Sequence, residues 1–283
     1  MQSNNPVFRR SEEFNRAGGQ TYAGYGEPST WSTGQAGAPA QPAYGAPQAP
    51  ANDARMTIDS VVQKTSISLG VVIVAALATW ILTPDVTSGS ASEDIAPLAA
   101  AVTIGALGAF ALSMVNSFKK VISPALVLAF CVLEGVALGA LSKLFNIAYG
   151  DGVVQGAVIG TFAAFGGTLA VYKIFNIKVG AKFQRMVIAA VLGMVGLSVM
   201  ELILGAFGAE IGLFGVSGLG MITAFAGLIL GVFMLVMDFD FVEQGIANGL
   251  PERESWRAAF AMTVSLVWIY TNLLRILAFF SQD

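Results

Sequence analysis

Long stretches without charged side chains constrain the fold of this chain more than any other feature. Four are free of charge: residues 65–84, 95–118, 152–172 and 211–237. Three contain one charged residue each: 121–142 with Glu134, 186–209 with Glu201 and 258–282 with Arg275. About 20 apolar residues in an α-helix cross the hydrocarbon core of a bilayer. The sequence therefore predicts an all-α membrane protein with seven transmembrane helices.

Composition supports a membrane location and excludes several function classes. Charged residues make up 12% of the chain, against about a quarter in a typical soluble domain. A net charge of −3 with thinly spread lysine and arginine leaves no basic patch for nucleic acid. The chain has one cysteine, Cys131, and no histidine, so disulfides and the usual zinc, haem and serine-histidine sites are excluded. We expect no cofactor and no enzymatic activity.

Residues 1–55 differ in composition from the rest of the chain. Six of the ten prolines fall here, among glycine, alanine, glutamine and tyrosine. Such a segment buries too little apolar surface to offset the entropy of ordering. The sequence thus predicts a disordered tail over 1–55, followed by a membrane domain over 56–283.

The distribution of lysine and arginine predicts the orientation. With the amino terminus in the cytoplasm, 13 of the 15 lysines and arginines lie on the cytoplasmic side, all except Lys143 and Arg275. An excess of lysine and arginine in cytoplasmic loops is the general rule for membrane proteins. We therefore expect a multi-pass protein of the cell membrane with its carboxyl terminus outside.

Charged groups inside the predicted spans are candidates for function, because a charge in hydrocarbon is costly. At 1.5 Å per residue, Glu134, Glu201 and Arg275 lie about 20, 22 and 27 Å from the cytoplasmic ends of their helices. We expect the three to form one buried network. Such a network is either a static clamp between helices or part of an ion path.

An acidic cluster follows the sixth span, in Met237-Asp238-Phe239-Asp240-Phe241-Val242-Glu243. On a continuing helix, Asp238 and Asp240 would face different neighbours. Asp238 is nearest the hydrocarbon, and we predict that it is buried. For Asp240 and Glu243 a solvated helix end is the favoured interpretation.

Several of these segments resemble the transmembrane Bax inhibitor motif family. The resemblance covers about residues 56–280 and depends on the acidic exit from the sixth span and on Tyr270-Thr271-Asn272-Leu273-Leu274-Arg275-Ile276-Leu277. Asn5-Pro6-Val7-Phe8-Arg9-Arg10 and Glu134-Gly135 are similar to an actinobacterial branch. The resemblance implies a bundle with the seventh helix at its centre. It also implies a pH-sensitive calcium or cation leak gated by two aspartates; Asp238 matches the first, and Ser265 occupies the position of the second.

We therefore expect a passive, pH-sensitive cation leak or channel, with calcium as the expected ion. The candidate pathway and gate residues are Asp238, Glu134, Glu201, Arg275, Asp240 and Asn116. If the second and sixth helices are neighbours, Lys119 or Lys120 beside Asn116 would hold the Asp238 carboxylate. The expected partners are the lipid bilayer and calcium ions or protons. The alternative function is a regulatory or scaffold protein that binds membrane proteases or cell-envelope machinery through its tail, and a secondary transporter is a third possibility.

Overall fold

The computed structural model describes residues 54–84, 92–209, 211–216 and 218–282, without the side chains of 92–94 and 151. Nearly all of the predicted tail lies outside the described residues. The described chain forms seven helices, each long and apolar enough to cross a membrane: α2 (Ile58–Leu82), α3 (Ser92–Phe118), α4 (Pro124–Tyr149), α5 (Asp151–Ile174), α6 (Ala181–Ala206), α7 (Gly218–Ala247) and α8 (Glu254–Phe280). The predicted all-helical architecture with seven spans is confirmed.

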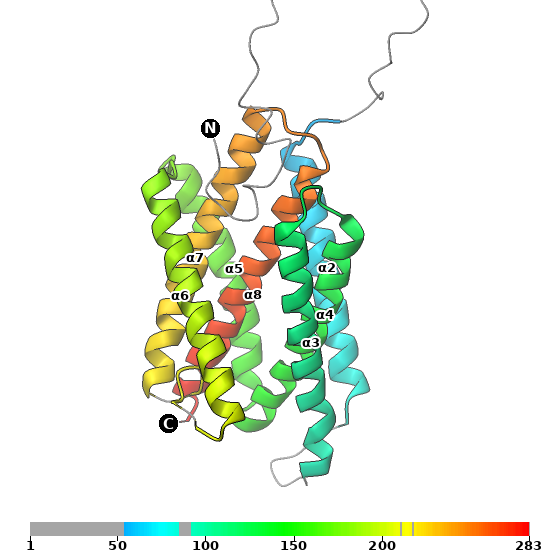
Figure 1. Ribbon diagram of the computed structural model, residues 1–283, viewed down its shortest axis with the longest axis vertical. Coiled ribbons are helices and arrows are strands. Elements are labelled where there is room, and N and C mark those ends of the chain that lie inside the picture. The colour runs from blue at the N-terminus through cyan, green and yellow to red at the C-terminus, as the bar shows by residue number, and fades with distance from the viewer. Residues whose placement is uncertain (1–53, 85–91, 210, 217, 283) are drawn as a thin grey trace, which may run out of the picture.

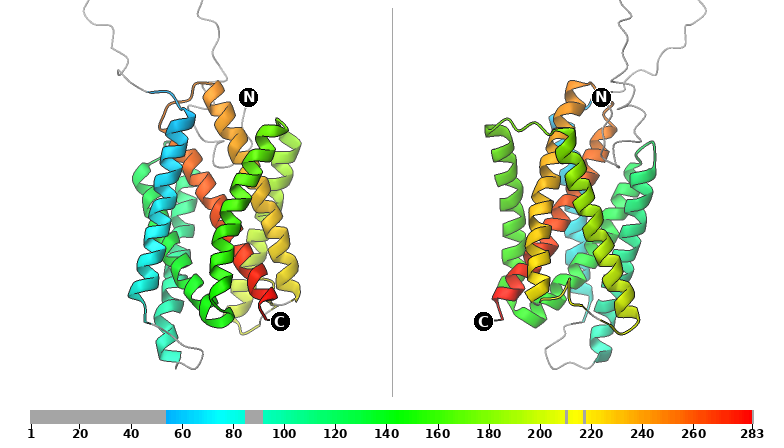
Figure 2. Two further views of the ribbon diagram at one scale, coloured as in Figure 1. Left: turned by 180° about the vertical axis from the view of Figure 1, so that it is seen from behind. Right: turned by 60° about the vertical axis from the view of Figure 1, so that its left-hand side comes forward.

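Helix α8 occupies the centre of the bundle. It runs obliquely between α2, α3 and α4 on one side and α5, α6 and α7 on the other (Figures 1 and 2). It packs against α7, α5, α2 and α4. The run Ala258–Thr263 is buried at every position, so this part of α8 has no face toward lipid. The central position of the seventh span, implied by the family resemblance, is thus observed.

Glycines allow the helices to approach closely, because small residues let two backbones come together in a membrane bundle. A side chain at Gly139 of α4 would overlap the backbone of Ala76 on α2, and one at Gly135 would overlap the carbonyl of Val72. On α7, a side chain at Gly227 would overlap the amide group of Asn272 on α8.

A short segment before α2, residues 54–57, fastens the start of the described chain to the α7–α8 connection; we call it the strap. Met56 N–H donates to the Leu250 carbonyl at 2.7 Å, and Glu252 N–H donates to the Ala54 carbonyl at 2.6 Å. The Met56 side chain is 2% exposed. The end of the bundle where α2 and α8 begin is called the strap end.

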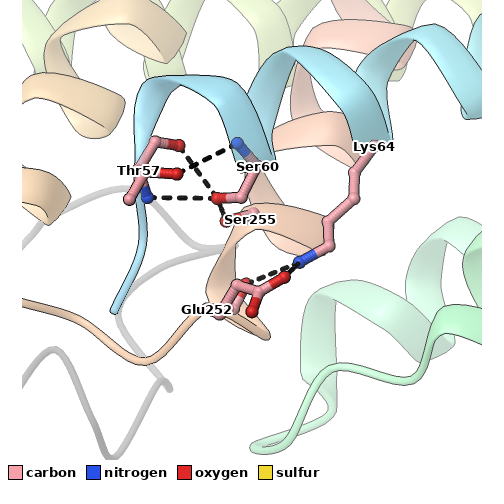
Figure 3. Close-up of polar contacts among 5 residues, drawn as sticks. All are labelled: Thr57, Ser60, Lys64, Glu252 and Ser255. Carbon is pink, nitrogen blue, oxygen red and sulfur yellow. Dashed lines mark hydrogen bonds and ion pairs between the residues drawn. The ribbon is translucent and has the colours of Figure 1, made fainter. Parts of the chain in front are cut away.

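Side chains of α2 reinforce the strap end (Figure 3). Thr57 caps α2 through a capping box with Ser60, which satisfies backbone N–H groups of the first turn. Lys64 Nζ lies 2.7 Å from Glu252 Oε1 and donates to the Glu252 carbonyl at 3.1 Å. The hydroxyls of Ser60 and Ser255 are 2.7 Å apart. The α7–α8 connection is therefore held from one side by α2.

Helix α7 begins and ends later in the chain than the uncharged stretch that predicted this span. It begins at Gly218 and continues to Ala247, whereas the uncharged stretch covers 211–237. Residues 211–216 instead belong to the connection between α6 and α7. The continuation past Met237 keeps the acidic cluster in helical geometry, which fixes the direction of each carboxylate.

Candidate functional site

Asp238 on α7 meets Ser265 on α8 inside the bundle. The Ser265 hydroxyl donates to Asp238 Oδ2 at 2.6 Å. Asp238 is 4% exposed and Ser265 is 1% exposed. In the described part of the chain Ser265 is the only hydrogen-bond partner of this carboxylate, and no lysine or arginine forms an ion pair with it. The predicted burial of Asp238 is confirmed, and its partner is a neutral hydroxyl.

The expected contact of Asp238 with Asn116, Lys119 or Lys120 is wrong. Helix α3 packs against α4 and is not a neighbour of α7. The buried Asn116 amide donates to the Leu126 carbonyl at 3.3 Å, across the turn between α3 and α4. Lys119 and Lys120 are exposed at the surface. Asn116 therefore braces a turn and does not contribute to the Asp238 site.

Asp240 faces the connection between α5 and α6, and Glu243 faces the last turn of α5. Asp240 accepts hydrogen bonds from Val179 N–H at 3.3 Å and from Gln244 Nε2 at 2.6 Å. Glu243 accepts a hydrogen bond from the Tyr172 hydroxyl at 2.6 Å. Asp240 is 7% exposed, so the expectation of a solvated side chain is wrong for this residue, because the α5–α6 connection covers it. Glu243 is exposed.

A line of polar contacts continues from Asp238 along α7 and α8. Trp268 Nε1 donates to the Gly227 carbonyl at 2.8 Å, and the Asn272 amide donates to the Trp268 carbonyl at 2.7 Å. On α8 the polar positions 265, 268, 272 and 275 are three or four residues apart, so they share one helix face. We call this line the α7–α8 seam: Asp238, Gly227 and Thr223 on α7 with Ser265, Trp268, Asn272 and Arg275 on α8.

Arg275 ends the seam at the far end of the bundle. Its Nη2 donates to the Leu213 carbonyl at 2.9 Å, the Gly220 carbonyl at 2.8 Å and the Thr223 hydroxyl at 2.9 Å. The guanidinium carbon lies 5.3 Å from the centre of the Phe214 ring, within cation–π range. Arg275 therefore fixes the α6–α7 connection to the start of α7.

Glu201 on α6 holds the same connection. Its Oε1 accepts hydrogen bonds from Gly212 N–H at 2.7 Å and Leu213 N–H at 3.3 Å. Glu201 and Arg275 thus bind the N–H and the carbonyl of the same residue, Leu213. Among the described residues no ion pair joins the two side chains. Both side chains therefore bind the backbone of Leu213 and not each other. These hydrogen bonds stabilise the two charged groups at this depth of the bundle.

Glu134 is not part of this arrangement. It is partly buried on α4, beside Gly135, which packs on α2. Within the described ranges no hydrogen bond or ion pair joins it to Glu201 or Arg275. The prediction of one network of Glu134, Glu201 and Arg275 is therefore wrong, because Glu201 and Arg275 bind backbone groups of the α6–α7 connection and not one another.

Sequence reasoning missed Thr223, Trp268 and Asn272. The signal for the two α8 residues is the polar spacing Ser265, Trp268, Asn272 and Arg275 in an otherwise apolar span, which marks one face of a helix. Thr223 has no comparable signal. Among the described residues no group of three or more carboxylates, cysteines or histidines could hold a metal ion. Asp238 is the single carboxylate of the α7–α8 seam.

Comparison with known protein families decides the classification. The model of the Bax inhibitor 1-like family matches residues 5–282, nearly the whole chain. The chain belongs to this family. The Bax inhibitor 1-like chain is thus a multi-pass membrane protein of a family that is generally not enzymatic. A search among curated proteins finds none that matches.

Proposed function

We propose that this Bax inhibitor 1-like protein is a passive, pH-sensitive cation leak of the cell membrane, with calcium as the expected ion. Cations cross along the α7–α8 seam, and Asp238 is the gate. The observation that carries the proposal is a carboxylate that is 4% exposed and bound only by the neutral Ser265 hydroxyl in the described chain. Carboxylate and carbonyl oxygens are the ligands that calcium prefers.

The pH dependence follows from the surroundings of Asp238. An ionised carboxylate in an apolar interior is costly unless an opposite charge pairs with it. Without a lysine or arginine partner, Asp238 has two ways to lower this cost: it binds a proton or it binds a cation. Protons and cations therefore compete for the same group. When the proton is bound, the Asp238–Ser265 contact stays closed; ionisation favours entry of water and cations between α7 and α8.

The described structure fits the closed form. Leu235 and Phe239 on α7 and Leu266 on α8 flank the Asp238–Ser265 pair, and they belong to one packed cluster with Met56 and Leu250. Met56 comes from the strap and Leu250 from the α7–α8 connection, so this cluster separates Asp238 from the solution at the strap end. Opening requires the cluster to loosen.

We propose that the strap end faces the cytoplasm. This assignment supports a path that begins near Asp238 and ends at the α6–α7 connection on the outer side, where Arg275 and Glu201 hold the backbone. It agrees with the lysine and arginine count, because eight of the 15 lysines and arginines lie in the α3–α4, α5–α6 and α7–α8 connections or within five residues of them.

A flux assay tests the proposal. The full chain is reconstituted into vesicles that contain a calcium-sensitive dye, and calcium entry is measured from acidic to mildly alkaline pH. We expect the parent to leak more as pH rises and Asp238→Asn to lose this dependence. Ser265→Asp should move the midpoint of the flux curve to higher pH, because two adjacent carboxyl groups hold one proton between them.

Asp240→Asn is the matched control. Asp240 is an equally buried aspartate two residues away, but it contacts the α5–α6 connection and not α8. It should keep the pH dependence of the parent. The proposal fails if Asp238→Asn keeps the parent profile, or if Asp240→Asn flattens it equally.

The scaffold alternative receives support from the strap. The hydrogen bonds of Met56 and Glu252 bring the start of the described chain onto the α7–α8 connection. A membrane protease or cell-envelope protein bound to the preceding residues would therefore act at this end of the bundle. A pure scaffold would show no calcium flux in vesicles that contain only this chain, whereas a leak needs no partner.

A further inference from the structure

A groove on the side of the bundle has no role in the α7–α8 seam. It lies between α2 and α5, is floored by α8, and has a volume of about 330 Å³. The left view of Figure 2 shows α8 between α2 and α5. The α2 wall runs from Leu69 to Trp80 and the α5 wall from Val154 to Phe162. Leu266, Val267 and Tyr270 of α8 form the floor, and Leu138, Gly139 and Ser142 of α4 complete the lining. We call it the α2–α5 groove.

The chemistry of the groove favours hydrocarbon. The Ser142 hydroxyl donates to the Leu138 carbonyl of its own helix at 2.6 Å, and it lies 2.6 Å from the Tyr270 hydroxyl. Thr161 donates to the Ala157 carbonyl at 2.7 Å. These hydroxyls already have partners, so a polar ligand gains little from them. An apolar cavity of about 150 Å³ stays dry and binds benzene, and this one is larger.

The shape and surroundings identify the occupant. From Leu69 to Trp80 the α2 wall is about 16 Å long at 1.5 Å per residue, so the groove is elongated along the helix. Its rims are exposed apolar side chains: Leu77 is 56% exposed on α2, and Phe162 is 53% exposed on α5. On a membrane-spanning helix such faces meet lipid tails, and the groove is continuous with them. The bilayer therefore supplies extended hydrocarbon directly at its mouth.

We propose that the α2–α5 groove binds one acyl chain of a membrane phospholipid, which packs directly on the central helix α8. A chain in the groove contacts Leu266, the residue after Ser265. It differs from ordinary boundary lipid, which touches only the outer faces of α2 and α5. An influence of the bound chain on gating rests on the proposed function, but its binding does not.

Photo-crosslinking tests the site. The full chain is reconstituted in vesicles of phosphatidylcholine and phosphatidylglycerol with a trace of phosphatidylcholine that carries a diazirine at mid-chain. After irradiation, adducts are mapped by peptide mass spectrometry. We expect adducts on the Leu266–Tyr270 segment of α8 as well as on the outer faces. The segment Ala258–Met262 of α8, which is buried throughout, gives the background level.

Two neighbouring substitutions separate groove binding from boundary lipid. Val158→Trp places a large side chain in the groove, whereas Ile159→Trp adds it at the next residue, which is 69% exposed and does not line the groove. Adducts on Leu266–Tyr270 should fall to background in Val158→Trp and persist in Ile159→Trp. If purified Val158→Trp is not monodisperse, Leu77→Trp on the α2 wall replaces it as the variant that fills the groove.

Three results would overturn the proposal. The first is labelling of Leu266–Tyr270 no higher than that of Ala258–Met262 in the parent. The second is unchanged α8 labelling in a folded groove-filling variant. The third is labelling of α8 by a diazirine fatty acid but not by the phospholipid, which would assign the groove to a free acid.

Discussion

Removal of one partner of the Glu254–Arg257 pair should cost more than removal of both. The pair lies in the first turn of α8, with both side chains 0% exposed. Arg257 Nε is 2.8 Å from Glu254 Oε2, and Arg257 Nη2 donates to the Lys120 carbonyl at 2.9 Å. The pair therefore connects the base of the central helix to the α3–α4 connection.

The magnitude follows from the burial of both charges. Arg257→Met keeps most of the apolar stem but leaves the Glu254 carboxylate without its cation, which costs about 3–5 kcal/mol when one partner of a buried pair is removed. The double variant Glu254→Met, Arg257→Met removes both charges and replaces them by apolar groups. Such replacements are often neutral or stabilising. The double variant should therefore be more stable than Arg257→Met by about 2 kcal/mol or more.

The assay is unfolding of the full chain in mixed micelles as denaturing detergent is increased, with thermal melting as a second measure. Lys119→Met is the matched control, because Lys119 is an exposed cation next to Lys120, and it should change stability by less than about 0.5 kcal/mol. If the stability changes of Glu254→Met and Arg257→Met, each measured alone, simply add in the double variant, the charges are not coupled and the reasoning is refuted.

Three further predictions concern the far end, the helix contacts and the orientation. Arg275→Leu should lower the unfolding free energy by at least about 2–3 kcal/mol, because Leu213 and Gly220 carbonyls lose a charged donor; a melting temperature equal to that of the parent would show that the contact is not structural. Gly139→Ala should destabilise by about 1–3 kcal/mol through overlap with Ala76, whereas Gly166→Ala, with open space at its Cβ, should not; equal melting of both would refute the packing argument. In a Cys131→Ala background, a cysteine at exposed position 248 should react with an impermeant maleimide only after the cells are opened, and reaction in intact cells would reverse the proposed orientation.

Some features of the site were predictable as positions along the chain. The resemblance placed Ser265 opposite the sixth-span aspartate, and the structure shows the two side chains in contact at 2.6 Å. Gly135 and Gly139 lie four residues apart on α4, a spacing that favours close helix packing in lipid, and both glycines lie against α2. The identity of the partner helix was not predictable, since a glycine pair shows that a helix comes close but not which helix.

The network around Arg275 shows the opposite case. Three charged residues at one depth suggested an ion-pair cluster, because the sequence displays side chains and not the backbone groups near them. In the structure Arg275 and Glu201 instead bind the carbonyl and the N–H of Leu213, in the connection that follows α6. A pattern of side-chain charges cannot reveal such partners.

The sequence by itself determined the seven membrane spans, because the cost of a charge in hydrocarbon is paid residue by residue and needs no knowledge of neighbours. It also determined that the seventh span carries polar residues at helical spacing. Only the tertiary structure decided that α3 lies beside α4 and away from α7, and hence that Asp238 meets a serine and not a lysine. The physical reason is that in lipid both the buried and the outward helix faces are apolar, so the hydrophobic pattern does not show which faces meet.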